Sequence, residues 1–296
     1  MLFLDIVNET IYVFPMTSEY DASAFPPFAV TADVALFMIH DDALNVLLVK
    51  RGGEPYRDAW ALPGGFVLPE EGLQEAAARE LAEETGLAEG AWYMEQLAAF
   101  GAPGRDPRMR VVTVAFWAIC AELPASPKAG GDAAKTRFEP VEPIESGALP
   151  LAFDHAQIVR GALEQIRSGM KHTALAARFC PPEFTIRHLR QVYETVWGFP
   201  LDPGNFQRFV RESGAFEQRG SAAPPPEMSA RMPSHDTDFL HGVAPSAPVA
   251  RDRWPVRGRP ASLWAARKTD DGRPAMAARS IAGAGRPPVG DSRARD

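Results

Sequence analysis

The chain has 296 residues, of which 46% are hydrophobic and 23% are charged, a length sufficient for two domains with separate cores. This composition lacks a long uncharged apolar run, which argues against a membrane-spanning helix. The net charge of −7 is unevenly divided, because residues 1–167 hold 12 basic and 25 acidic side chains whereas residues 168–296 hold 19 and 13. An acidic half favours divalent cations, and an arginine-rich half favours phosphate backbones.

The two cysteines, Cys120 and Cys180, have no Cys or His neighbours at metal-ligand spacing. We therefore expect buried free thiols in a protein of the reducing cytoplasm. Composition also predicts how the chain divides. The expected segments are a loose leader over 1–26 (in which composition favours Met16 as the natural start, after 1–15), a first domain over 27–167, a second over 168–268 with a disordered insert at 221–256, and a disordered tail at 269–296.

Hydrophobic periodicity predicts the elements of the first domain. The expected elements are a hairpin of strands 30–39 and 46–50, a helix over 73–85 stopped by Gly86, a strand–turn–strand unit over 94–120, a short strand over 138–144, and a long helix capped by Asp154. This order predicts a mixed sheet with one helix on each side.

The predicted helix over 73–85 carries three carboxylates at spacings i, i+3 and i+4, namely Glu80, Glu83 and Glu84. This spacing places them on adjoining parts of one helical face, where like charges disfavour the helix by a few tenths of a kcal/mol per pair, roughly. A hard divalent cation reverses that penalty, because Mg²⁺ prefers carboxylate oxygens and shares its shell with substrate phosphates. The alternative is a solvated acidic face, which is common on surface helices.

The segment GFVLPEEGLQEAAARELAEETGL matches every defined position of the Nudix box, so the first domain resembles the Nudix hydrolases. The matching residues are Gly65, Glu71, Arg79, Glu80, Leu81, Glu83, Glu84, Gly86 and Leu87. The resemblance implies an α/β/α sandwich in which the three carboxylates and the Gly65 carbonyl bind Mg²⁺ or Mn²⁺. It also implies that Glu71 and Arg79 brace the loop against the helix. The general base would be Glu83 or a loop acid, for which Asp132 is a candidate.

Flanking segments LLVKRGGEPYRDAWALPGGF and FGAPGRDPRMRVVTVAFW resemble the ADP-ribose pyrophosphatase branch of the Nudix superfamily. That resemblance suggests that Arg51 and Arg105 lie near the phosphates or ribose, where a guanidinium fork suits two oxygens. A surface salt bridge is the alternative for both. The same resemblance suggests that Trp60 faces an adenine, and burial in the core is the alternative.

The second domain is predicted to contain two short helices, one capped by Thr185 and stopped by Gly198, the other capped by Asp202 and stopped by Gly214. In the second helix Phe206, Phe209 and Val210 form an inward stripe. The outward polar residues are Asn205, Gln207, Arg208 and Arg211. Asn, Gln and Arg are side chains that read base edges in a major groove.

Residues 181–220 followed by RGRPASLW resemble the winged helix of the Nudix-related transcriptional regulators of NAD metabolism. The resemblance implies an α+β chain in which a Nudix domain precedes a winged helix-turn-helix, with Arg257 and Arg259 at the tip of the wing. The insert at 221–256 splits this wing and leaves its pairing open. A small helical domain for dimerisation is the alternative to DNA binding.

Two functions from different classes follow. The first is a Nudix hydrolase that cleaves ADP-ribose or a related nucleotide and also binds duplex DNA as a homodimer, without a membrane partner. The second is a repressor that senses ADP-ribose with little or no turnover. A complete set of metal ligands favours hydrolysis, and a hydrolase with a purely structural tail is a third possibility.

Overall fold

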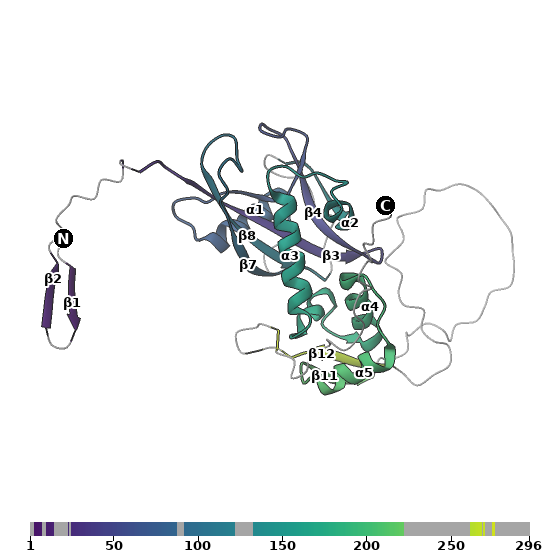
Figure 1. Ribbon diagram of the computed structural model, residues 1–296. Helices are drawn as coiled ribbons and strands as arrows, with labels where there is room; N and C mark the ends of the chain where they lie inside the picture. The colour runs from purple at the N-terminus through teal and green to yellow at the C-terminus, as the bar shows by residue number, and fades with distance from the viewer. Residues whose placement is uncertain are drawn as a thin grey trace, which may run out of the picture.

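The computed structural model describes residues 3–7, 10–14, 23, 25–87, 92–121, 133–221, 261–267, 269 and 274–275 (Figure 1). Its elements are, in chain order, β1 (Phe3–Val7), β2 (Thr10–Phe14), β3 (Ala29–His40), β4 (Ala43–Arg51), β5 (Trp60–Ala61), β6 (Gly64–Phe66), α1 (Leu73–Thr85), β7 (Tyr93–Phe100), β8 (Val111–Ile119), β9 (Ala133–Pro140), α2 (Glu142–Glu145), α3 (His155–Gly169), the 3₁₀ helix η2 (Ala174–Phe179), β10 (Phe184–Thr185), α4 (Ile186–Trp197), α5 (Pro203–Glu212), β11 (Phe216–Ser221) and β12 (Ser262–Ala266).

A seven-stranded mixed sheet forms the first domain. Strands β3 and β8 run parallel at its centre, while β4 and β6 pair antiparallel with β3, β7 with β8, and β5 and β9 with β4. The two-residue turn between β3 and β4 places Asp41 and Asp42 at φ 50° and 58°. Positive φ at both central residues matches the twist of a tight hairpin, so the predicted hairpin is present but its turn is shorter than the predicted one over 40–45.

Each face of this sheet is covered by one helix, as predicted, because alternate residues of β3 point to opposite sides. Val34 and Leu36 pack in a cluster with Leu81 of α1. Phe37 packs in a second cluster with Ile158 of α3. The α1 side therefore carries the predicted metal-binding helix, and the α3 side faces the second domain.

The second domain is a winged helix built from α4, α5 and a three-stranded sheet with order β10–β12–β11. The predicted caps are present: the Thr185 hydroxyl accepts a hydrogen bond from the His188 N–H at 3.1 Å, and the Asp202 carboxylate accepts one from the Asn205 N–H at 2.8 Å. Phe206 is fully buried, with its ring centroid 5.2 Å from that of Tyr193. The inward stripe predicted for α5 is thus its core face.

Helix α3 joins the two domains, and Figure 1 shows it running from the large sheet to the winged helix. Arg167, near its end, donates to both carboxylate oxygens of Glu145 at 2.7 and 3.1 Å and to the Val196 carbonyl of α4 at 3.0 Å. One continuous apolar cluster contains residues of both domains, for example Trp117 and Val192. The winged helix is therefore packed on the first domain.

Within the predicted leader, β1 and β2 pair with each other, because both are runs of apolar and β-branched residues. Two other sequence predictions were wrong in detail. The strand predicted for 138–144 ends at Pro140, and α2 begins at Glu142 because a proline in the first turn favours a helix start. Asp154 stands at the N-cap position of α3 but makes no side-chain cap there, since its carboxylate binds Arg105.

The wing pairs despite its split sequence: β11 and β12 are antiparallel, although residues 222–256 of the predicted insert lie outside the described residues. Ser221, the first residue of that insert, belongs to β11. Within the predicted tail, Ala275 accepts a hydrogen bond from the Ala174 N–H at 2.9 Å and donates one to the Arg267 carbonyl at 3.1 Å. This short part of the tail therefore packs on η2, and most of the rest lies outside the described residues.

Both cysteines are buried and free, as predicted. Among the described residues, no helix has the length and apolar character needed to cross a bilayer.

Candidate functional site

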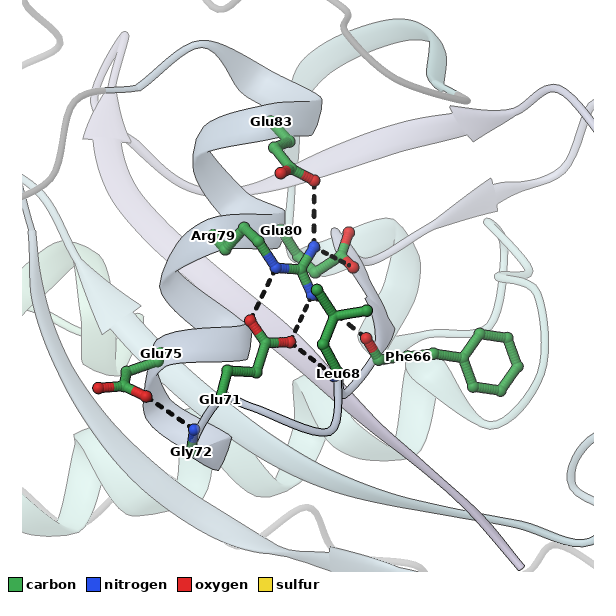
Figure 2. Close-up of polar contacts among 8 residues, drawn as sticks. All are labelled: Phe66, Leu68, Glu71, Gly72, Glu75, Arg79, Glu80 and Glu83. Carbon is green, nitrogen blue, oxygen red and sulfur yellow. Dashed lines mark hydrogen bonds and ion pairs between the residues drawn. The ribbon is translucent and has the colours of Figure 1, made fainter.

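The loop from β6 to α1 is held in place by Arg79 and Glu71 (Figure 2). The Arg79 guanidinium donates to both oxygens of Glu71, at 2.8 Å through Nε and at 2.6 Å through Nη2, and to the Phe66 carbonyl at 3.2 Å. Glu71 also accepts a hydrogen bond from the Leu68 N–H at 2.8 Å. These contacts fix the loop at both of its ends, so that Glu71 and Arg79 have the bracing geometry predicted for them.

Arg79 also binds two of the predicted metal ligands. Its Nη1 donates to Glu80 at 2.8 Å and to Glu83 at 3.1 Å. Three carboxylates thus surround one guanidinium, which raises the pKa of Arg79, mainly through Glu71 and despite partial burial. The same pair, with help from the Leu68 N–H, lowers the pKa of Glu71 to about 2.

Two glycines let carboxylates approach the backbone of β6. A Cβ on Gly65 would lie 2.1 Å from an oxygen of Glu80, and a Cβ on Gly64 would lie 2.4 Å from an oxygen of Asp33. A side chain at position 65 would displace the Glu80 carboxylate, and one at position 64 would also meet the backbone of Ala32 and Asp33. Glycine at position 65 is therefore required for Glu80 to lie against this strand.

Glu84 is the most deeply enclosed of the three α1 carboxylates and accepts a hydrogen bond from the Gly64 N–H at 3.0 Å. Burial, followed by the negative charges of Glu80 and Asp33, raises its pKa to about 8. Burial also raises the pKa of Glu80, with smaller contributions from Glu83 and Glu71. Carboxylates that repel one another in a partly buried site have the donor chemistry that Mg²⁺ or Mn²⁺ binds, so the residue types fit a divalent cation.

The arrangement is not yet that of a closed metal shell. Within the described ranges, no three His, Cys, Asp or Glu side chains converge closely enough to hold one ion. On α1, the Glu83 carboxylate does not converge with those of Glu80 and Glu84, because its side chain is 56% exposed and bound to Arg79. All three carboxylates line the cleft described below, and Glu83 would reach a cation held by Glu80 and Glu84 by turning away from the guanidinium.

These carboxylates form one wall of a cleft of about 560 Å³. The rest of the lining, called the basic wall here for its arginines, comes from the end of β4, the loop after it, the loop between β7 and β8, and the segment around the start of α3. It contains Arg51, Gly52, Gly53, Glu54, Arg105, Asp106, Arg108, Phe153 and His155. A cleft lined by carboxylates and by guanidinium groups suits a ligand that carries phosphates, which a metal ion and arginines can both bind.

Arg105 lines this cleft but is already paired. Its guanidinium donates to Asp154 at 3.0 and 2.6 Å and lies 3.6 Å from Asp33, and its side chain is only 4% exposed. Burial opposes the charge, yet Asp154 and Asp33 outweigh it and raise the pKa of Arg105. His155 completes this cluster by accepting the Leu62 N–H at 2.8 Å through Nδ1. The predicted alternative of a salt bridge therefore describes Arg105, although the bridge is buried.

The other two predicted substrate residues differ in position. Arg51 lines the cleft, where its Nε donates to the Pro55 carbonyl at 2.8 Å. Trp60 is half-buried beside the core, lies outside the cleft lining, and is covered by Arg137 at 4.0 Å from its ring centroid. The structure thus brings Arg51 together with the α1 carboxylates and leaves Trp60 apart from them.

Asn205, Gln207, Arg208 and Arg211 are all exposed on one side of α5, as the stripe predicted. Arg257, Arg259 and Asp132 lie outside the described residues. Sequence reasoning missed Asp33, Arg108 and Phe153 as cleft residues. Only Asp33 carried a signal, because an acid within the apolar strand VTADVALF needs a partner or a function.

The fold and the box together define a Nudix domain followed by a winged helix. Residues 29–161 match the family described as NUDIX domain, and residues 176–225 match the NrtR DNA-binding winged helix domain.

Two similar proteins cover most of the chain, and a third covers part of it. The chain is 33% identical over 227 residues to the ADPR responsive transcriptional repressor NtrR of Acinetobacter baylyi, covering 75% of this chain and 89% of that protein. It is similar to a crystal structure of Shewanella oneidensis NrtR complexed with a 27mer DNA, with a TM-score of 0.57 and 27% identity over 80% of this chain and 93% of that one. An ADP-ribose pyrophosphatase of Methanocaldococcus jannaschii is 38% identical over 117 residues, 39% of this chain and 64% of that enzyme. The chain belongs to the NrtR family.

Glu71 makes the stability of the Nudix domain depend on pH. Its pKa is lowered from 4.5 to about 2 in the folded chain, so its ionised form stabilises the fold above pH 4.5 and this contribution disappears as the pH falls towards 2. We expect Glu71→Gln to lower the melting temperature at neutral pH and the gap from the unmodified chain to narrow between about pH 5 and pH 3. Circular dichroism melts across this range measure it. The same substitution at its exposed neighbour Glu70 is the control, and a gap independent of pH contradicts the prediction.

Proposed function

We propose that the Nudix domain hydrolyses the pyrophosphate of ADP-ribose, or of a related nucleoside diphosphate derivative, with Mg²⁺ or Mn²⁺. The observation that carries this proposal is the complete acidic set of α1 lining a cleft together with arginines, with Glu80 seated against Gly65. A site that only senses a nucleotide does not require every metal ligand. The similarity to an ADP-ribose pyrophosphatase supports the choice of substrate.

The chemistry divides between the two walls of the cleft. Glu80, Glu83, Glu84 and the Gly65 carbonyl would hold the cation, which supplies charge neutralisation on the phosphates and a more acidic water. Water adds to one phosphorus, the bridging P–O bond breaks, and AMP and ribose 5-phosphate leave. A carboxylate of the acidic wall, Glu83 in the first instance, accepts the proton of the attacking water. Arg51 binds phosphate oxygens from the basic wall.

We further propose that the winged helix binds duplex DNA, with α5 in the major groove and a homodimer on a two-fold-related site. The exposed face of α5 supports this, because four polar side chains stand outward while Phe206 and Val210 anchor the helix. The similarity to an NrtR complexed with DNA points the same way.

The second candidate is a repressor that responds to ADP-ribose with little turnover. It is favoured by the match to a repressor over 89% of that protein's length. The two candidates share the ligand and the DNA and differ only in whether the bound nucleotide is cleaved, which the first of the following predictions decides.

Removing two charges from α1 should abolish hydrolysis. We expect Glu83→Gln/Glu84→Gln to lower kcat/KM for Mg²⁺-dependent cleavage of ADP-ribose by about 100-fold or more, with an unchanged fold by circular dichroism. Release of AMP, followed by chromatography, is the measurement. The matched control is Glu70→Gln/Glu75→Gln, which removes two charges outside the cleft. Unchanged turnover in the α1 double variant refutes the metal assignment, whereas no turnover in the unmodified chain favours the sensor.

Arg208 should contribute to sequence preference. If it makes a bidentate contact to a base, Arg208→Gln should cost about 1–3 kcal/mol on the preferred duplex and little on random duplex. Fluorescence anisotropy at moderate salt, with duplexes from the chain's own upstream region, measures this. Arg160→Gln, an exposed change on α3, is the control for charge alone. If the unmodified chain prefers no duplex over random sequence, the winged helix has a structural role.

A further inference from the structure

Phe153, which lines the cleft, and its neighbour Tyr56 have unusual backbone conformations. Phe153 has φ 53° and Tyr56 has φ 64°, in the left-handed region that bulky side chains rarely adopt. Such residues persist where surrounding contacts hold them, and they concentrate at ligand sites. Here the two rings hold each other, edge to face, with centroids 4.8 Å apart. The backbone on both sides of the contact is thereby arranged to place the Phe153 ring at the cleft.

The Phe153 ring is shared by two guanidinium groups. The Arg51 guanidinium carbon lies 4.8 Å from the ring centroid, and that of Arg108 lies 6.0 Å from it. The guanidinium carbon of Arg108 is also 5.3 Å from the ring centroid of Phe66, the last residue of β6 and a further lining residue of the cleft. Cations over aromatic faces keep their charge available while their position is restricted. Phe153 therefore holds two positive charges side by side in the cleft.

Arg51 and Arg108 differ from Arg105 in their carboxylate partners and in their exposure. In the described part of the chain, the Arg51 guanidinium pairs with no carboxylate, and burial together with the charge of Arg108 lowers its pKa. Arg108 donates to Asp106 at 3.1 Å through Nε and at 2.7 Å through Nη2. Its side chain is 41% exposed, against 4% for Arg105. Arg108 can thus reach a ligand with Nη1, while Arg105 is enclosed by Asp154 and Asp33.

We propose that Arg51 and Arg108, positioned by the ring of Phe153, form the anion site that binds the diphosphate group of the nucleotide. This inference rests on the proposed function and changes one of its residues, because Arg108 takes the place that the sequence suggested for Arg105. Phe153 is a positioning residue: it touches the two guanidinium groups and acts through them. The diphosphate then lies between two cations on this wall and the carboxylates of α1 on the other.

Calorimetric titration without divalent metal tests the site independently of hydrolysis. The probes are inorganic pyrophosphate, which reports on the anion site alone, and ADP-ribose. We expect Arg51→Gln and Arg108→Gln each to weaken both probes by about ten-fold or more, the loss of a charge-assisted contact. The matched control is Arg110→Gln, since Arg110 also lies over a phenylalanine, Phe28 at 5.2 Å, but stands outside the cleft lining.

The role of Phe153 has its own test in the same titrations. Phe153→Leu keeps an apolar side chain but removes the aromatic face, so binding of both probes should weaken. Phe153→Tyr keeps the face and should restore the affinity of the unmodified chain. A purely structural role predicts that the melting temperature falls in parallel with affinity. We expect affinity to follow the presence of the ring whatever the melting temperature does.

Each outcome decides the inference. Unaltered binding of both probes by Arg108→Gln overturns it, and so does an unmodified chain that binds neither probe. If pyrophosphate binding depends on Arg108 but ADP-ribose does not bind, the anion site stands and the proposed substrate fails. If ADP-ribose is hydrolysed normally by Arg108→Gln and bound as before, the proposed function stands and the inference fails.

Discussion

The Arg79 guanidinium binds three carboxylates of the Nudix box, and the positions of the other residues in the acidic wall depend on these contacts. Glu71, Glu80 and Glu83 all accept hydrogen bonds from it, between 2.6 and 3.1 Å. Without this cation, like charges at i, i+3 and i+4 would repel one another on α1. With it, the loop from β6 is fixed against the helix, and Glu80 can lie where only a glycine at position 65 leaves room. The same guanidinium binds Glu83 at 3.1 Å, so a divalent cation would compete with Arg79 for this carboxylate.

The arginines of the basic wall have two different roles. One is held in a buried ion pair, and two keep nitrogens available for a ligand. Arg105 is enclosed with Asp33 and Asp154 at the start of α3, which continues into the junction with the winged helix. Arg51 and Arg108 rest on an aromatic ring and retain nitrogens for a ligand. Breaking a buried pair leaves an uncompensated charge, which costs far more than releasing an exposed one. Arg51, which pairs with no carboxylate among the described residues, and Arg108, which is 41% exposed, are accordingly better suited to reversible binding than Arg105.

Local signals were enough to predict much of this chain. Helix α1 begins at Leu73 and ends before Gly86 as its pattern indicated, and the caps at Thr185 and Asp202 are present, since a helix and its caps depend on residues close in sequence. The partner of Arg105 could not be predicted in this way, because Asp154 is 49 residues distant and meets it only after the sheet forms. The role of Phe153 could not be predicted from the sequence for the same reason. Its backbone conformation and its contacts with arginines far away in the sequence arise from tertiary packing.

The central claim is that a diphosphate is held between the α1 carboxylates and an arginine pair on the basic wall. A crystal structure of the chain soaked with ADP-ribose in the presence of a metal chelator tests it most directly, because the intact ligand is then seen in place. The account predicts both phosphates inside the cleft, within hydrogen-bond distance of Arg51 and Arg108, with Arg105 still bound to Asp154. A diphosphate bound by Arg105, or a nucleotide bound outside the cleft, would contradict it.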